Sequence, residues 1–273
     1  MAKRTFLKFS KGFTLVELIV VITIVTVLAV SLTTIFTDTT KGYLQAEQRI
    51  DMASNTRVTL DKLSRQIREA MPNSIRVNVS QTCVEYVPIV AATQYTSLPT
   101  TAPSTSLTVV EADAETRVSG LDATSSYVMV IPLNSSEVYN VNSGHFAQIT
   151  SFAKLGSNLT EVSISNTRFS RQSPQRRVFF VTQPASVCLV GSELHLYENY
   201  GFQVTQPAPT AMGTPQILAD NLSLVDRYGT AIPVFTYDAG TLSRGGILQT
   251  VLIVAGRDES IRVEHEIHVR NFP

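Results

Sequence analysis

The sequence predicts an α+β fold in which one long N-terminal helix packs on a large, mainly antiparallel β-rich head. Three observations lead to this prediction. Residues 13–36 form a nearly continuous apolar run, residues 37–71 continue with helical periodicity, and residues 72–273 contain short β-rich runs between polar, Gly and Pro connections. A long helix followed by consecutive strands is typical of the α+β class.

The chain begins with a basic leader, residues 1–12, which reads MAKRTFLKFSKG. The leader has no acid and carries four cations, Lys3, Arg4, Lys8 and Lys11. It ends at Gly12, directly before Phe13. An ordinary secretory signal has its cleavage site after the apolar region, whereas the suitable junction here, Gly12–Phe13, precedes it. Cleavage at this junction would leave the apolar helix on the mature chain.

The apolar segment, residues 13–36, is long enough to cross a membrane. As a helix it spans roughly 36 Å, against about 30 Å for a hydrocarbon core. The cationic leader favours a cytoplasmic N-terminus, so the rest of the chain is expected outside the inner membrane. A single carboxylate, Glu17, lies inside the run. A charge inside a membrane-length helix is costly and indicates a function.

Residues 37–71 are expected to continue the helix as an amphipathic segment that packs on a sheet. Residues 33–40 are rich in Thr, a weak helix former, and Pro72 ends the helix. Between them, apolar residues recur at helical spacing and charged residues occupy the other face. The apolar positions are Ile50, Ala53, Leu60, Leu63, Ile67 and Ala70.

The head, residues 72–273, is expected to be built from short strands and to form one large sheet domain or two smaller sheets. Residues 247–254 are apolar on both faces and predict a central strand, while 260–269 alternate and predict a half-buried one. Two Pro-containing segments, 93–106 and 206–215, are expected to be exposed loops. The predicted strands are 74–79, 83–90, 107–111, 127–132, 162–164, 178–182, 186–190, 193–197, 222–225, 234–237, 247–254 and 260–269.

The chain has two cysteines, Cys83 and Cys188, each in a strand-like run. Export places both in an oxidising compartment, where disulfides persist. One bridge would close a loop of about 105 residues and stabilise the fold by about 4 kcal/mol in the loop-entropy model. The alternative is two unpaired buried thiols. Two cysteines are too few for a four-thiolate zinc site.

Composition and motifs exclude several functions. The net charge is 0; without the four leader cations, 18 basic residues stand against 22 acidic ones, which leaves −4. Nucleic-acid binding is therefore not predicted, and the one basic cluster, Arg168, Arg171, Arg176 and Arg177, is interpreted as a solvated loop.

No catalytic residue, metal site or cofactor is predicted, and the chain is not expected to be an enzyme. The histidines His145, His195, His265 and His268 have no nucleophile motif near them, and no phosphate loop or H-E-x-x-H occurs. Along a strand His265 and His268 would point to opposite faces. The alternating acids Glu111, Asp113 and Glu115 indicate only a weak calcium candidate, without the EF-hand pattern.

The basic leader, the Gly12–Phe13 junction and Glu17 inside KGFTLVELIVVITIVTVLAV together resemble the type IV prepilin signal. The segments LSRQIREAMPNSIRVNV, CVEYVPI, VYNVNSGH and EHEIHVRNFP resemble minor pilins of the J-like group, especially those of the mannose-sensitive haemagglutinin (MSHA) pilus. Many principal pilins have a proline about 21 residues after the cleavage point, where this chain has Thr34.

The resemblance implies cleavage by prepilin peptidase after Gly12 and N-methylation of Phe13. It implies that Glu17 pairs with the N-terminal amine of a neighbouring subunit. The expected partners are other minor and major pilins, prepilin peptidase and the inner membrane. The expected location is a single-pass inner-membrane protein with a periplasmic head, later assembled in a surface pilus.

Three alternatives remain open. A plain signal anchor explains the apolar span and the leader charges but not Gly12 or Glu17. A minor pseudopilin of a type II secretion machine shares the anchor and a J-like head. A tip adhesin would use the same anchor to display a head that binds a surface or a glycan, although the chain has no Trp and the sequence shows no convergent aromatic or basic set.

Overall fold

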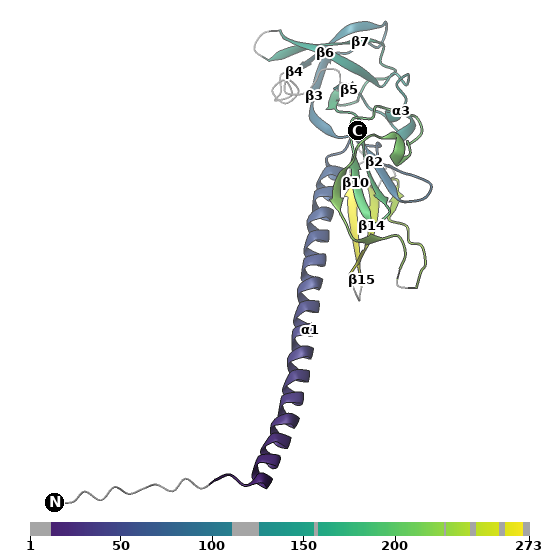
Figure 1. Ribbon diagram of the computed structural model, residues 1–273. Helices are drawn as coiled ribbons and strands as arrows, with labels where there is room; N and C mark the ends of the chain where they lie inside the picture. Colours follow the sequence, from purple (N-terminus) through teal and green to yellow (C-terminus); the bar gives the residue numbers. More distant parts are fainter. Residues whose placement is uncertain are drawn as a thin grey trace, which may run out of the picture. The chain divides into compact units, whose positions relative to one another are not determined.

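The computed structural model describes residues 12–110, 126–155, 158–226, 228–240, 244–256 and 260–269 (Figure 1). The chain divides into two compact units, Met1–Asp51 and Met52–Pro273. One helix, α1 (Leu15–Arg68), contributes to both units. The antiparallel strands all belong to the second unit, so the α+β class expected from the sequence is confirmed.

The first unit contains the apolar part of α1. Its large side chains are exposed, as the lipid-facing residues of a membrane helix would be. Several hydroxyls donate to the backbone carbonyl four residues earlier, among them Thr26, Ser31, Thr33, Thr39 and Thr40. These bonds satisfy polar groups that lipid cannot, and α1 runs unbroken through the Thr-rich residues. Among the described residues, α1 is the one helix long and apolar enough to cross a membrane, and an 18-residue window within it has a mean hydropathy of 2.8.

The remainder of α1 packs into the second unit along a narrow stripe. The buried positions follow helical spacing: Thr56, Thr59, Leu60, Leu63, Ser64 and Ile67. Hydroxyls therefore replace part of the expected apolar face, while Ile50 and Ala53 are exposed, contrary to the prediction. Thr56 Oγ1 donates to the Met52 carbonyl at 2.7 Å, which makes a buried Thr tolerable because its hydroxyl is satisfied.

Two antiparallel sheets share one hydrophobic core with this stripe of α1. Leu63 and Ile67 lie in the same cluster as Val187 and Leu194 of the first sheet and Leu252 of the second. The first sheet has the order β1 (Arg76–Val77), β2 (Cys83–Tyr86), β9 (Ala185–Val190), β10 (Glu193–Tyr197) and β11 (Gln216–Ala219). The second contains β12 (Leu222–Ser223), β13 (Phe235–Asp238), β14 (Gly246–Ala255) and β15 (Ser260–Val269).

The second sheet bears out two sequence predictions. β14 is central, because it pairs with β12 and β13 on one side and with β15 on the other. β15 alternates as expected, with Ile267 and Val269 buried and Glu266 and His268 exposed. Period-2 alternation is a reliable signal when one face of a strand is buried.

The other described strands form a closed barrel with a separate core. Its order is β3 (Ile89–Ser97), β4 (Ser104–Val110), β7 (Leu159–Thr167), β6 (Phe146–Lys154), β5 (Tyr127–Met129) and β8 (Arg177–Val181). The short helix α3 (Ser135–Tyr139) lies between β5 and β6 in the chain. We call residues 87–184 the barrel lobe; Figure 1 shows its strands above β2, β10 and β14.

The barrel lobe is inserted between two neighbouring strands. β2 ends at Tyr86 and β3 begins at Ile89, while β8 ends at Val181 and β9 begins at Ala185. β2 and β9 are adjacent and antiparallel, with Tyr86 opposite Ala185. The lobe therefore leaves the first sheet and returns to it at the same place.

The strand prediction fails in polar segments of the lobe and at β11 of the first sheet. β3 and β4 extend into residues 93–106, which were expected to be a loop, and Tyr95 is only 4% exposed. β6 and β11 were not predicted. In a barrel the neighbouring strands satisfy each backbone, so Thr- and Ser-rich chain is held as strand without a strong apolar pattern. Residues 206–215 are largely irregular, as predicted, but contain the 3-10 turn η2 (Pro209–Ala211) and a buried Met212.

A buried ion pair connects these parts of the second unit. Arg76 on β1 pairs with Glu85 on β2, whose side chain is fully buried. Tyr200 donates its hydroxyl to Glu85 Oε1 at 2.8 Å, and Arg76 donates to two backbone carbonyls in the loop after β10. The Arg76 guanidinium also lies 3.6 Å above the Tyr139 ring of α3. Burial raises the pKa of Glu85, and the hydrogen bond from Arg76 opposes that rise.

Leu63 tests whether the α1 stripe stabilises the second unit. Leu63→Ala removes a side chain that is 1% exposed and is expected to lower the free energy of unfolding by about 3 kcal/mol through lost burial and a cavity. Urea unfolding of the full chain in detergent measures the change. Val58→Ala, at a 67% exposed position of the same helix, is the control and should change stability little; equal losses for the two variants would contradict the packing.

Candidate functional site

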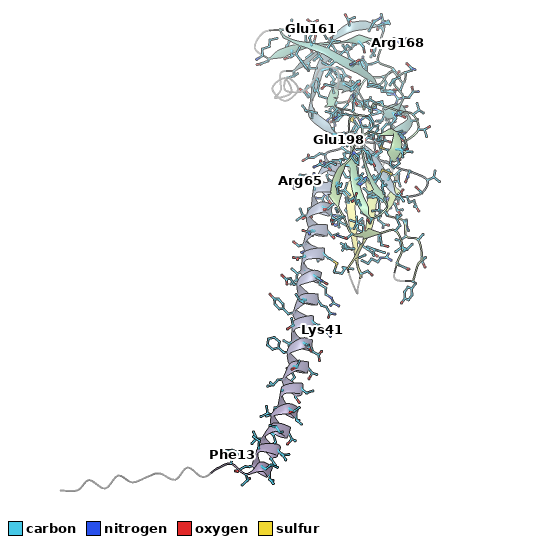
Figure 2. All side chains as sticks on the ribbon, in the orientation of Figure 1. Phe13, Lys41, Arg65, Glu161, Arg168 and Glu198 are labelled. Carbon is cyan, nitrogen blue, oxygen red and sulfur yellow. A yellow bond between two sulfur atoms is a disulfide. The ribbon has the colours of Figure 1, made fainter. Side chains whose placement is uncertain are left out.

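The junction expected to be cleaved lies just before the first turn of α1. Residues 12–14 have no regular secondary structure, and Phe13, labelled in Figure 2, is 73% exposed. A Cβ added at Gly12 would meet no atom within 4 Å. The described fold therefore does not require glycine at this position. Any requirement for glycine here must come from another protein that binds this segment.

Thr14 and Glu17 form a capping box at the start of α1. The Glu17 N–H donates to Thr14 Oγ1 at 3.3 Å, and the Thr14 N–H and hydroxyl donate to Glu17 Oε2 at 3.5 and 3.4 Å. Such reciprocal bonds satisfy free N–H groups of a helix N-terminus, where a carboxylate is also favoured by the helix dipole. All three contacts are long, so the carboxylate is held locally by weak bonds.

The capping role of Glu17 was not predicted, although the sequence carries a signal for it. The pattern Thr14-x-x-Glu17 directly before an apolar run is a capping-box signature. Within the described chain Glu17 therefore serves as a cap of α1.

A disulfide joins Cys83 and Cys188, the pair expected from the sequence. The two residues lie directly opposite each other on β2 and β9, with their Cα atoms 4.1 Å apart. The Leu189 N–H donates to the Thr82 carbonyl, so the neighbouring pair 83/188 is of the non-hydrogen-bonded kind, in which Cα atoms approach most closely. The bridge is buried beside Tyr197 and Met212.

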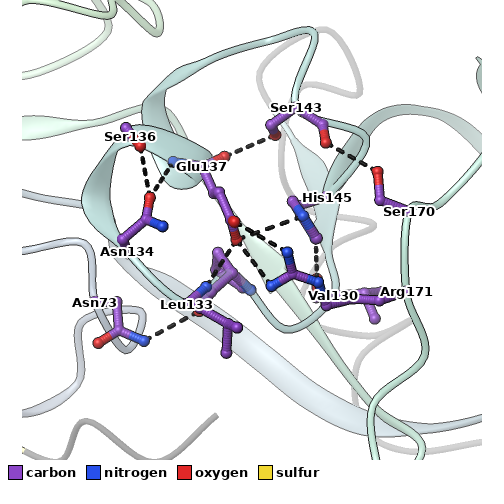
Figure 3. A network of polar contacts seen from close by, with 11 residues as sticks. Asn73, Val130, Leu133, Asn134, Ser136, Glu137, Ser143, His145, Ser170 and Arg171 are labelled. Carbon is purple, nitrogen blue, oxygen red and sulfur yellow. Dashed lines mark hydrogen bonds and ion pairs between the residues drawn. The ribbon is translucent and has the colours of Figure 1, made fainter. Parts of the chain in front are cut away.

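A second polar cluster, shown in Figure 3, was not found from the sequence. Glu137 on α3 receives two bonds from Arg171, at 3.0 and 3.1 Å, and the Leu133 N–H at 2.9 Å. His145 Nε2 lies 3.4 Å from Glu137 Oε2, and His145 Nδ1 lies 3.2 Å from the Val130 carbonyl. Arg171 is thus half of a bidentate ion pair and not part of a solvated loop, which corrects the interpretation of the arginine cluster.

Neighbouring charges and burial shift both titrating groups of this cluster. Burial acts to raise the pKa of Glu137, but the Leu133 N–H, the Arg171 guanidinium and His145 together hold that pKa below its usual value. Burial lowers the pKa of His145, and Arg171 adds to that effect while Glu137 opposes it. The cluster therefore contains an ionised Glu137 and a neutral His145 near pH 7. The partners are far apart in sequence, and no local motif signals them.

The other histidines serve local contacts. His265 Nε2 lies 2.7 Å from Ser64 Oγ and links β15 to α1, while His268 lies on the opposite, exposed face of β15, as predicted. His195 lies 2.7 Å from Glu193 and 3.1 Å from the Tyr197 hydroxyl. Within the described part of the chain no group of three His, Cys, Asp or Glu could hold a metal ion.

Two sets of sequence-predicted residues lie outside the described residues. They are the leader cations Lys3, Arg4, Lys8 and Lys11, and the calcium candidates Glu111, Asp113 and Glu115. Of the arginine cluster, Arg168, Arg176 and Arg177 are exposed.

Comparison with known proteins identifies the N-terminal segment. Residues 7–33 match the family model of the prokaryotic N-terminal methylation motif. This match supports a type IV pilin-like protein, a structural rather than a catalytic class, and the motif implies processing by prepilin peptidase and assembly with other pilins. No curated protein and no solved structure matches the chain.

The Glu137 cluster predicts a pH-dependent contribution to stability. Because the folded-state pKa of Glu137 is lowered, its stabilisation is complete above the unfolded-state pKa of about 4.3 and is lost as the pH falls through the folded value. Glu137→Gln should cost about 1–3 kcal/mol at pH 7, and the cost should shrink between pH 5 and pH 3.

Urea unfolding of the full chain in detergent at several pH values measures this cost. Glu161→Gln is the matched control, because Glu161 makes no ion pair with a described residue. A cost of Glu137→Gln that stays constant from pH 5 to pH 3 would show that the carboxylate charge is not what stabilises the cluster.

Proposed function

We propose that this chain is a minor type IV pilin of the J-like group that acts in pilus assembly or initiation, or at the pilus tip. The observation that carries the proposal is the N-terminal segment, in which Gly12–Phe13 precedes an apolar helix with one early carboxylate, Glu17. Prepilin peptidase cuts after Gly12 and leaves N-methylated Phe13 as the first residue. The apolar helix then remains on the mature subunit.

The capping box supports a specific role for Glu17 in assembly. In the membrane-embedded subunit the carboxylate accepts weak bonds from Thr14. In a fibre the ammonium group of a neighbouring subunit replaces them, because an ion pair between desolvated charges is stronger than a long neutral hydrogen bond. An unpaired buried charge is expensive, so this exchange favours one axial register between subunits.

The apolar helix and the leader support the location. The helix anchors the subunit once in the inner membrane with its head in the periplasm, and the subunit then enters a surface pilus together with major and other minor pilins. The disulfide between Cys83 and Cys188 fits an oxidising compartment. A head of two sheets and a barrel is large, which favours a scarce subunit over the repeating subunit of a thin fibre.

The head sequence resembles the minor pilin MshO of the MSHA pilus in the segments CVEYVPI, VYNVNSGH and EHEIHVRNFP. A type II secretion pseudopilin has the same kind of anchor. The identity of the neighbouring genes separates these two assignments.

Processing is tested by N-terminal mass spectrometry of the membrane-bound protein. The expected mature chain begins at N-methyl-Phe13. Gly12→Val should block cleavage because it adds a branched side chain where the peptidase requires none, whereas the fold has open space at that position. An intact leader on the unsubstituted protein would overturn the prepilin assignment.

Glu17→Ala is expected to leave membrane insertion intact and to reduce incorporation into pili at least tenfold, because the neighbour's amine loses its partner. Quantitative immunoblotting of sheared pili and of membranes measures the two pools. Glu47→Ala, an exposed acid on the same helix, is the control and should enter pili normally. Normal incorporation of the Glu17 variant would remove this residue from the assembly mechanism.

A further inference from the structure

The barrel lobe carries a surface depression of about 440 Å³ on the side of β5, β6 and the end of β7. Its size falls within the range of small-molecule pockets. The lining combines two aromatic rings with several amides and hydroxyls and one cation. The residues used below are Tyr127, Phe146, Asn142, Asn166, Thr167 and Arg168.

One wall of the depression is held in place by bonds to the opposite strand connection. The Ser170 N–H donates to the Gly144 carbonyl at 2.8 Å, and Ser170 Oγ donates to the Ser143 carbonyl at 3.0 Å. Gly144 has φ +72, and a Cβ there would lie 2.2 Å from Ser170 Oγ. Any other residue would be strained at this φ and would force the Ser170 hydroxyl away from the Ser143 carbonyl, so glycine is needed for the bonds that hold this wall.

The cluster of Glu137, His145 and Arg171 also holds this wall in place. Ser143 Oγ donates to the Glu137 carbonyl at 2.7 Å, and Arg171, which follows Ser170 in the chain, is clamped by the Glu137 carboxylate. Figure 3 shows these bonds between Glu137, Ser143 and Arg171. A rigid wall lowers the entropic cost of binding.

The aromatic part of the depression is also fixed. The Tyr127 ring packs edge-on against Phe146 and Phe202, with ring centroids 5.6 and 5.0 Å away. Tyr127 remains half-buried, and no described residue forms a hydrogen bond with its hydroxyl. A partly exposed ring with a free hydroxyl offers both an apolar contact and a polar one to a ligand.

The charge in the depression has one sign. Arg168 is exposed, and Figure 2 shows it on the outside of the lobe. It forms no ion pair with a described residue, and none of the residues that line the depression is acidic. One free guanidinium among amides and hydroxyls suits a ligand that has a single carboxylate and many hydroxyl groups.

We propose that this depression binds a saccharide that carries a carboxylate. The Arg168 guanidinium holds the carboxylate, Asn142, Asn166 and Thr167 exchange hydrogen bonds with the sugar hydroxyls, and the Tyr127 ring contacts an apolar face of the sugar. A single cation fits a carboxylate better than a phosphate dianion. The binding requires neither processing at Gly12 nor assembly, so it stands or falls independently of the pilin proposal.

The test compares sodium glucuronate with glucose, which differ at the carboxylate. Saturation-transfer NMR and titration calorimetry are performed on the full chain in detergent micelles. Glucuronate is expected to bind with a Kd on the order of 1 mM, as a ligand of this size allows, and glucose at least tenfold more weakly. Arg168→Gln should weaken glucuronate binding about tenfold and leave glucose unchanged. Asn166→Ala should weaken both sugars.

Arg177→Gln is the matched control, since Arg177 is exposed on the same lobe but does not line the depression. Its glucuronate affinity should equal that of the parent chain. The proposal is overturned if neither sugar receives saturation, if Arg168→Gln binds glucuronate as the parent does, or if sodium sulfate at the same concentration, with the ionic strength held constant by sodium chloride, displaces glucuronate completely. Thermal unfolding of each variant confirms that the exposed substitutions leave the fold intact.

Discussion

The pair of Arg76 and Glu85 is the contact on which the arrangement of the second unit depends. Glu85 is fully buried, so its charge is tolerable only while Arg76 and the Tyr200 hydroxyl stay in place. Arg76 in turn needs the loop after β10 for its remaining N–H groups and the Tyr139 ring for its face. One buried charge thereby requires the first sheet, this loop and α3 to adopt their positions together.

The disulfide and the ion pair both involve β2 and lie close together along it. Cys83 and Glu85 are two residues apart on β2, and their cross-strand partners on β9 are Cys188 and Ser186. The covalent bridge sets the register of the two strands, and a one-residue slip would turn every side chain of a strand to its other face. In this register Glu85 lies opposite Ser186, whose hydroxyl is 2.8 Å from the Tyr200 hydroxyl that donates to Glu85.

Local signals predicted the anchor and the outlines of the head, and long-range contacts account for what was missed. The apolar run, the Thr14–Glu17 spacing and the alternation of β15 each lie within one element and can be detected there. The arginine cluster was interpreted wrongly because Arg171 meets Glu137 across 34 positions of sequence. The buried stripe of α1 was predicted to begin at Ile50, but Ile50 is exposed and packs on no described strand. Thr56 and Thr59 are buried instead, because each hydroxyl donates to a backbone carbonyl of the helix.

The position of the barrel lobe between β2 and β9 has a consequence for how such a head can diverge. The lobe departs and returns at adjacent ends of two strands that are already covalently joined. Its replacement by a tight turn, or by a different domain, would keep the disulfide and the pairing of β2 with β9, but it would remove the Tyr139 ring from Arg76 and uncover Met71. A different lobe can therefore be carried on the same pair of disulfide-linked strands, provided that it again covers Arg76 and Met71.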